Sequence, residues 1–110
     1  MSRGSFEVLW AEAAIRDLEQ IVDFIADEAP LAAQRLFDEI AERSQTLESL
    51  PRRGRIVPEL ARFEIMTYRE LVLRPYRLMY RIDEKRVLVA AVFDGRRNLE
   101  DAILARLNLG

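Results

Sequence analysis

Residues 69–97 constrain the fold of this chain more than any other stretch, because they contain three consecutive segments with the character of β-strands. The segment 76–83 alternates between apolar and polar residues. Its apolar face consists of Tyr76, Leu78, Tyr80 and Ile82. The segment 86–94 is apolar on both faces, which is typical of a strand in the middle of a sheet. Short turns at 74–75 and 83–86 separate the segments, so we expect an antiparallel meander.

The polar positions of this stretch are nearly all arginine. Arg77 and Arg81 belong to the polar face of the second strand. Arg96 and Arg97 follow Asp94 where the central strand meets a turn. Functional residues gather on loops that a rigid scaffold positions, so two guanidinium groups at the end of a central strand indicate a site.

The first half of the chain predicts one short strand and two amphipathic helices. Residues 5–10 alternate and are expected to form a strand at an edge of the sheet. A helix follows and ends at Ala29-Pro30, where Pro30 begins a second helix that stops before Pro51. The first helix is expected to bury Ala14, Leu18, Ile21, Val22 and Ile25. The second is expected to bury Ala33, Leu36, Phe37, Ile40, Ser44 and Leu47.

The remaining segments complete an α+β fold in a single domain covering residues 1–110. Residues 51–62 contain two prolines and a glycine and are predicted to be a loop. Asn98 is predicted to cap a short C-terminal helix. The expected architecture is an N-terminal strand and a helical hairpin packed on one face of an antiparallel sheet of about four strands.

Composition limits the chemistry that this chain can perform. It contains no cysteine and no histidine, which removes disulfides, thiolate nucleophiles and the usual neutral-pH acid–base group. Carboxylates that are adjacent in sequence diverge on a helix, so we expect neither a metal site nor a cofactor. No stretch approaches the roughly 18 apolar residues of a membrane span, and we expect a cytoplasmic protein without membrane contacts.

The charge is segregated along the chain. Residues 1–50 contain four basic and eleven acidic residues, a balance of −7, whereas residues 51–110 contain thirteen basic and eight acidic residues, a balance of +5. A basic second half behind an acidic first half suggests an anionic partner for the second half.

Seven sequence pieces, in order, resemble the RelE/ParE toxins of bacterial type II toxin–antitoxin systems. The first two are Trp10 with the apolar helix that follows it, and Ala29-Pro30 with Ala32-Ala33. The others are Leu50-Pro51 with Gly54-Arg55, Val57-Pro58-Glu59-Leu60, Arg69-Glu70-Leu71, Tyr76-Arg77-Leu78 with Tyr80-Arg81, and Gly95-Arg96-Arg97. The resemblance implies this fold, toxicity when unrestrained, and a small cognate antitoxin that wraps the chain.

The toxins that this chain resembles have two main activities. RelE-like members cut mRNA in the ribosomal A site, and their phosphate-binding arginines match Arg77 and Arg96, but their lysines and C-terminal tyrosine are not matched. ParE-like members poison DNA gyrase without catalytic residues, and the Arg69-Glu70-Leu71 and Gly95-Arg96-Arg97 pieces look more like that branch. We therefore favour gyrase as the target, with ribosome-dependent mRNA cleavage or a non-toxic antitoxin-binding module as alternatives.

Two sets of residues are predicted to bind partners. The target-binding set is Arg69, Arg77, Arg81, Asp94, Arg96 and Arg97. The antitoxin-binding set is Leu36, Phe37, Arg52, Arg53 and Arg55. The alternative for the strand arginines is a solvated outer face with surface ion pairs to Glu70 or Asp83, which contribute little stability.

Overall fold

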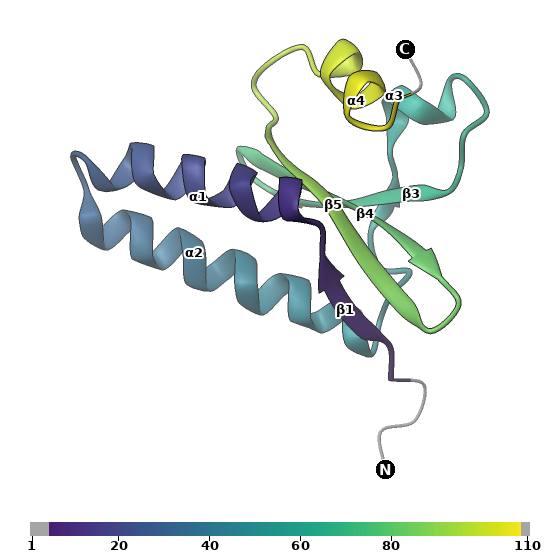
Figure 1. The fold of residues 1–110 in the computed structure, drawn as a ribbon, viewed down its shortest axis with the longest axis horizontal. Coiled ribbons are helices and arrows are strands. Elements are labelled where there is room, and N and C mark those ends of the chain that lie inside the picture. The colour runs from purple at the N-terminus through teal and green to yellow at the C-terminus, as the bar shows by residue number, and fades with distance from the viewer. Residues whose placement is uncertain (1–4, 109–110) are drawn as a thin grey trace.

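The computed structural model describes residues 5–108 as a sheet with a helical hairpin on one face and two short helices on the other (Figure 1). No helix in this part of the chain is long and apolar enough to cross a membrane. The elements are β1 (Glu7–Trp10), α1 (Glu12–Ala26), α2 (Pro30–Gln45), η1 (Thr46–Glu48), β2 (Arg55–Ile56), α3 (Pro58–Ala61), β3 (Tyr68–Leu73), β4 (Tyr76–Asp83), β5 (Arg86–Asp94) and α4 (Glu100–Arg106).

The strands lie in the order β1-β5-β4-β3-β2. The predicted meander of β3, β4 and β5 is confirmed, and β1 lies at one edge, as expected of the N-terminal strand. Its pairing with β5 is parallel, whereas an antiparallel sheet was expected. The sheet has five strands, so the prediction of about four was wrong. The additional strand, β2, lies in the stretch predicted to be a loop and is only two residues long, too short to produce an alternating pattern.

The hairpin of α1 and α2 covers one face of the sheet. Ala14, Leu18, Ile40 and Leu47 pack there against the apolar face of β4 and against Val87, Val89 and Val92 of β5. Tyr76, Leu78 and Tyr80 are buried in this layer, as their alternation predicts. Ile21, Val22, Ile25 and Leu36, predicted to be buried, are only partly buried. Phe37, also predicted to be buried, is 44% exposed and lines a groove between α1 and α2.

The opposite face of the sheet is covered in part by α3 and α4. Val57, Leu60, Leu99 and Ile103 form a second apolar cluster there with Met79 and Ala91. The alternative of a solvated outer face is therefore wrong for Arg77, whose side chain is 12% exposed, and Met79 between the two strand arginines is 1% exposed. The sequence pattern does not predict that these two helices cover the sheet, because α3 is only four residues long and α4 only seven, too short for a clear helical period.

A β-bulge in the β4–β5 ladder changes which β5 residues face the hairpin. Met79 pairs with Ala91 whereas Tyr80 pairs with Val89, so Ala90 is the extra residue. Simple alternation would place Val87, Val89 and Ala91 together on one face. The bulge instead brings Val92 to the hairpin side and leaves Ala91 under the short helices.

The C-terminal helix begins one residue later than an Asn98 cap would place it. Its N-cap position is Leu99, which has no capping side chain. The Oδ1 atom of Asn98 nevertheless accepts a hydrogen bond of 3.3 Å from the N–H of Glu100. Asn98 therefore supports the first turn without being the cap itself.

Candidate functional site: an arginine groove

Four arginines line one groove, which we call the arginine groove. It has a volume of about 410 Å³ and lies where the β3–β4 turn meets the end of β5. Its lining residues are Arg55, Val72, Arg74, Pro75, Arg77, Gly95 and Arg96. The structure thus brings together Arg77 and Arg96 from the predicted target-binding set and Arg55 from the predicted antitoxin-binding set.

Close backbone packing forms the floor of the groove. The N–H of Gly95 donates a hydrogen bond of 2.7 Å to the carbonyl of Pro75, which joins the β3–β4 turn to the end of β5. A Cβ atom at position 95 would lie 2.8 Å from that carbonyl oxygen and 3.0 Å from Cδ of Arg77. Glycine is therefore required for this approach, because any side chain would push the turn away from β5.

Arg77 is held by two carboxylates. Its Nη1 and Nη2 atoms donate to the two carboxylate oxygens of Glu59 at 2.8 and 2.6 Å, and its Nε donates to Oε1 of Glu70 at 2.7 Å. The side chain is only 12% exposed. The hydrogen bonds that Arg77 donates to Glu59 raise the pKa of Arg77 above its ordinary value and lower the pKa of Glu59.

Glu70 links Arg77 to Arg55. Arg55 of β2 and Glu70 of β3 are register partners, and Nε of Arg55 donates to Oε2 of Glu70 at 2.6 Å. The side chain of Glu70 is 2% exposed, so its charge is compensated almost entirely by these two guanidinium groups. Arg55, Glu70, Arg77 and Glu59 therefore form one continuous chain of ion pairs along the groove.

Asp94 orients Arg96 at the other end of the groove. Its Oδ1 accepts hydrogen bonds from the backbone N–H and Nε of Arg96, and its Oδ2 accepts from Nη2 at 2.8 Å. These hydrogen bonds lower the pKa of Asp94 to about 2. The guanidinium group of Arg96 stays exposed to solvent, so Asp94 fixes its orientation without burying it.

The other members of the predicted target-binding set lie outside the groove lining. Arg69 donates a hydrogen bond of 2.8 Å to the carbonyl of Gly54, which ties the loop before β2 to β3. Arg81 lies 3.6 Å from Asp83 in an exposed pair, as its structural alternative predicts. The side chain of Arg97 is exposed and has no ion-pair partner among residues 5–108.

Sequence reasoning missed Arg74. It is exposed in the β3–β4 turn, lines the groove, and forms no ion pair within the part of the chain that the structure describes. The other three groove arginines each pair with a carboxylate of the chain, so Arg74 is the groove arginine most available to an external partner. Its position before Pro75 in a turn beside the arginine-rich strand is the signal that could have identified it.

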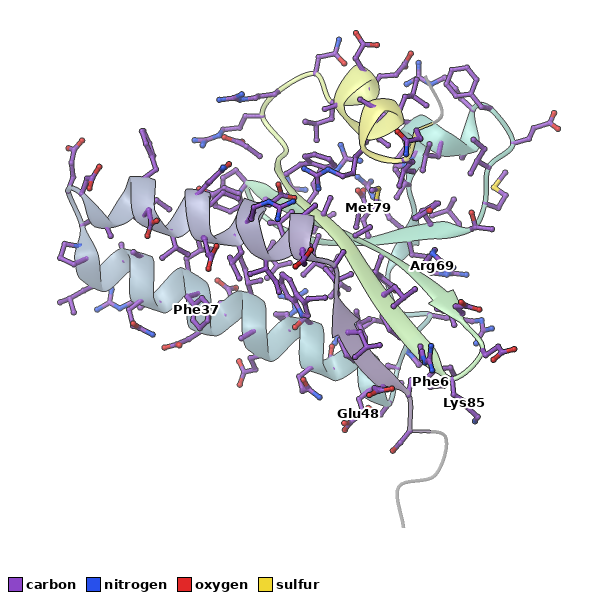
Figure 2. All side chains as sticks on the ribbon, viewed as in Figure 1. Phe6, Phe37, Glu48, Arg69, Met79 and Lys85 are labelled. Carbon is purple, nitrogen blue, oxygen red and sulfur yellow. The ribbon has the colours of Figure 1, made fainter. Side chains whose placement is uncertain are left out.

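The predicted antitoxin-binding residues separate into two places. Phe37 lines a groove of about 420 Å³ between α1 and α2, while Leu36 is partly buried against the core. Of the loop arginines, Arg53 donates to Oγ1 of Thr46 at the end of α2 at 2.9 Å, whereas Arg55 belongs to the arginine groove. Figure 2 shows Phe37 on the hairpin, away from Arg69 on the sheet.

The arginine groove carries a fixed positive charge. Its guanidinium groups keep their charge at all relevant pH values, and the lowered pKa values of Glu59 and Asp94 make both carboxylates weak bases near neutrality. Residues 5–108 contain no group of three or more carboxylates that could hold a metal ion.

Comparison with known proteins identifies the family of this chain. The chain is 32% identical over 87 residues to Toxin RelE2 of Caulobacter vibrioides, an alignment that covers 78% of this chain and 91% of that toxin. A chain of the chromosomal ParDE TA system from P. aeruginosa has the same fold, with a TM-score of 0.69 and 21% identity over 84% of this chain and 98% of that one. The family described as the ParE toxin of the type II toxin–antitoxin system parDE matches residues 8–99. This chain belongs to that family of toxins.

Proposed function

We propose that this toxin blocks growth by binding DNA gyrase, and that the arginine groove and the neighbouring Arg97 form its contact with the target. The observation that carries the proposal is that the carboxylates beside the groove are all paired with its arginines. Glu59, Glu70 and Asp94 all accept hydrogen bonds from arginine, so none of them serves as a proton acceptor. A groove of this kind favours recognition over bond cleavage.

A cognate antitoxin is the second partner that we propose, and its site is the groove between α1 and α2. Ile15 and Phe37 are both more than 40% exposed at this groove, and Trp10 and Leu18 add apolar surface to it. A partner helix with an apolar face would bury these side chains, as amphipathic helices do in hydrophobic grooves. This surface is separate from the arginine groove, so one antitoxin segment on the hairpin leaves the arginines for a second contact.

Gyrase supercoiling tests the proposed target directly. Purified toxin is added to gyrase and relaxed plasmid, with and without the protein encoded beside it, and the topoisomers are separated on a gel. We expect loss of supercoiling with accumulation of cleaved plasmid, and protection by the antitoxin. Unchanged supercoiling at a large excess of toxin would contradict the proposal.

Ribosome-dependent mRNA cleavage is the second candidate function, and the observation that favours it is that Arg77 and Arg96, which match the phosphate-binding arginines of RelE-like toxins, line one groove. Induction of the toxin without antitoxin separates the two candidates. Gyrase inhibition predicts a DNA-damage response with intact mRNA, whereas cleavage predicts mRNA cut at the ribosomal A site without early DNA damage. Normal growth with neither signal would indicate a non-toxic antitoxin-binding module.

A further inference from the structure

The ion pair between Glu59 and Arg77 occupies the part of Arg77 that would recognise an external anion. Guanidinium binds carboxylate and phosphate through the same paired N–H donors. Nη1 and Nη2 of Arg77 are both used by Glu59, and Nε is used by Glu70. All three nitrogens of the guanidinium group therefore have an internal carboxylate partner.

Packing holds Glu59 in this position. It lies on α3 between Val57 and Leu60, which are both fully buried against the second apolar cluster. The N–H of Val57 donates a hydrogen bond of 3.0 Å to the carbonyl of Tyr68, which fixes the start of α3 to β3. The carboxylate of Glu59 is thus presented to Arg77 by a fixed element, and its own side chain is only 18% exposed.

We propose that Glu59 is a specificity-determining residue that acts as a built-in anion and keeps external phosphate away from Arg77. A carboxylate attached to the same chain competes at an effective concentration on the order of millimolar, so a phosphate at micromolar concentration does not displace it. Arg55, Arg74 and Arg96, whose side chains are exposed, then remain accessible to an external anion. The occupied Arg77 therefore disfavours binding of a nucleic-acid backbone to the groove, because such binding needs several phosphate contacts at once.

Removal of the Glu59 carboxylate tests this inference. The variant Glu59→Ala is compared with Glu64→Ala, which makes the same change in net charge at an exposed position shortly after α3. Binding of inorganic pyrophosphate is measured by calorimetry, and binding of a fluorescent single-stranded RNA by anisotropy, both at about 50 mM salt. We expect Glu59→Ala to bind both ligands roughly tenfold more tightly than the unmodified chain, and Glu64→Ala to change affinity less than twofold.

Further variants show whether Arg77 is the source of the gain. Glu59→Ala combined with Arg77→Met should return to the original affinity, whereas Glu59→Gln should give part of the gain while keeping the shape of the side chain. Equal affinities for Glu59→Ala and Glu64→Ala would overturn the inference, as would a gain that survives Arg77→Met. A gain for an oligoglutamate peptide as large as that for RNA would overturn the assignment to phosphate.

The binding measurements contain neither gyrase nor antitoxin, so their failure would leave the proposed target untouched. Circular dichroism of each variant keeps the comparison among folded proteins, and the Glu59→Gln variant carries the test if the alanine variant unfolds.

Discussion

Asp17 of α1 and Arg106 of α4 form a two-pronged ion pair although they lie 89 residues apart. Nη1 and Nη2 of Arg106 donate to the two carboxylate oxygens of Asp17 at 2.7 and 2.8 Å, and Asp17 also accepts from the N–H of Val92 at 2.9 Å. The pairing of β1 with β5 ends at Val89. The Asp17–Arg106 pair therefore covers part of β5 that has no neighbouring strand on that side, and joins helices from the two faces of the sheet.

Asp17→Asn should lower the free energy of unfolding by about 1–3 kcal/mol, because the amide replaces a partly buried charged acceptor and presents N–H groups to Arg106. Urea denaturation followed by circular dichroism measures the change. Asp23→Asn, an exposed position on the same helix, is the control and should stay within about 0.5 kcal/mol. Equal free energies of unfolding for the two variants would show that the Asp17–Arg106 pair makes no net contribution to stability.

Tyr80→Phe should destabilise the protein by about 1–3 kcal/mol without changing its core volume appreciably. The Tyr80 hydroxyl donates to the carbonyl of Pro51 at 2.7 Å and accepts from the N–H of Gly54 at 3.0 Å, so its removal leaves two buried backbone groups unpaired. Tyr68→Phe is the control, since the Tyr68 hydroxyl has no hydrogen-bond partner among residues 5–108. Thermal unfolding should separate the two variants, and a lower midpoint for Tyr68→Phe would contradict this account.

The Asp94–Arg96 pair should lose its contribution to stability between about pH 4 and pH 2. The pKa of Asp94 is about 2 in the folded protein, below the roughly 3.9 of an unfolded chain. The pair therefore stabilises the fold above the unfolded pKa, and this contribution falls as the pH falls through the folded pKa. An NMR titration of the Asp94 carboxyl carbon should give a midpoint near pH 2, rising toward the unfolded value in Arg96→Ala. A midpoint unaffected by Arg96→Ala would refute the assigned cause.

Arg74→Ala should reduce gyrase inhibition by roughly tenfold if the arginine groove contacts the target, because Arg74 is exposed there and its loss leaves the internal ion pairs intact. The toxin concentration that halves supercoiling is the quantity to compare. Arg35→Ala removes the same charge from an exposed position on α2 and should change this concentration less than twofold. Equal effects of the two variants would place the target contact elsewhere.

Phe37→Ala should weaken antitoxin binding by about tenfold while leaving the fold stable, because this aromatic side chain is 44% exposed at the groove between α1 and α2. Calorimetry with the antitoxin encoded beside the toxin measures the affinity. Phe63→Ala is a matched control, since Phe63 is 51% exposed beyond α3 on the other side of the sheet. An unchanged affinity for Phe37→Ala would remove this groove from the interface.

Periodicity predicts the larger elements of this protein well. Alternation over 76–83 and the doubly apolar strand 86–94 predict the meander and its buried centre, which the pairing confirms. The apolar stripes of the two N-terminal helices correctly predict a hairpin that covers one face. These elements are long enough for a period of 2.0 or 3.6 residues to repeat. The tertiary structure buries the same apolar faces that this periodicity defines, so the local pattern and the fold agree.

Short elements and side-chain pairings were decided only by the tertiary structure. Strand β2 and helix α3 contain two and four residues, too few for any period to appear, and the bulge at Ala90 depends on the match between β4 and β5. The sequence alone predicted an arginine-rich site at the end of β5. The ion pair between Glu59 and Arg77, which are eighteen residues apart, results from the packing of α3 on the sheet. An ion pair between separate elements requires a register and an orientation that no local sequence pattern specifies.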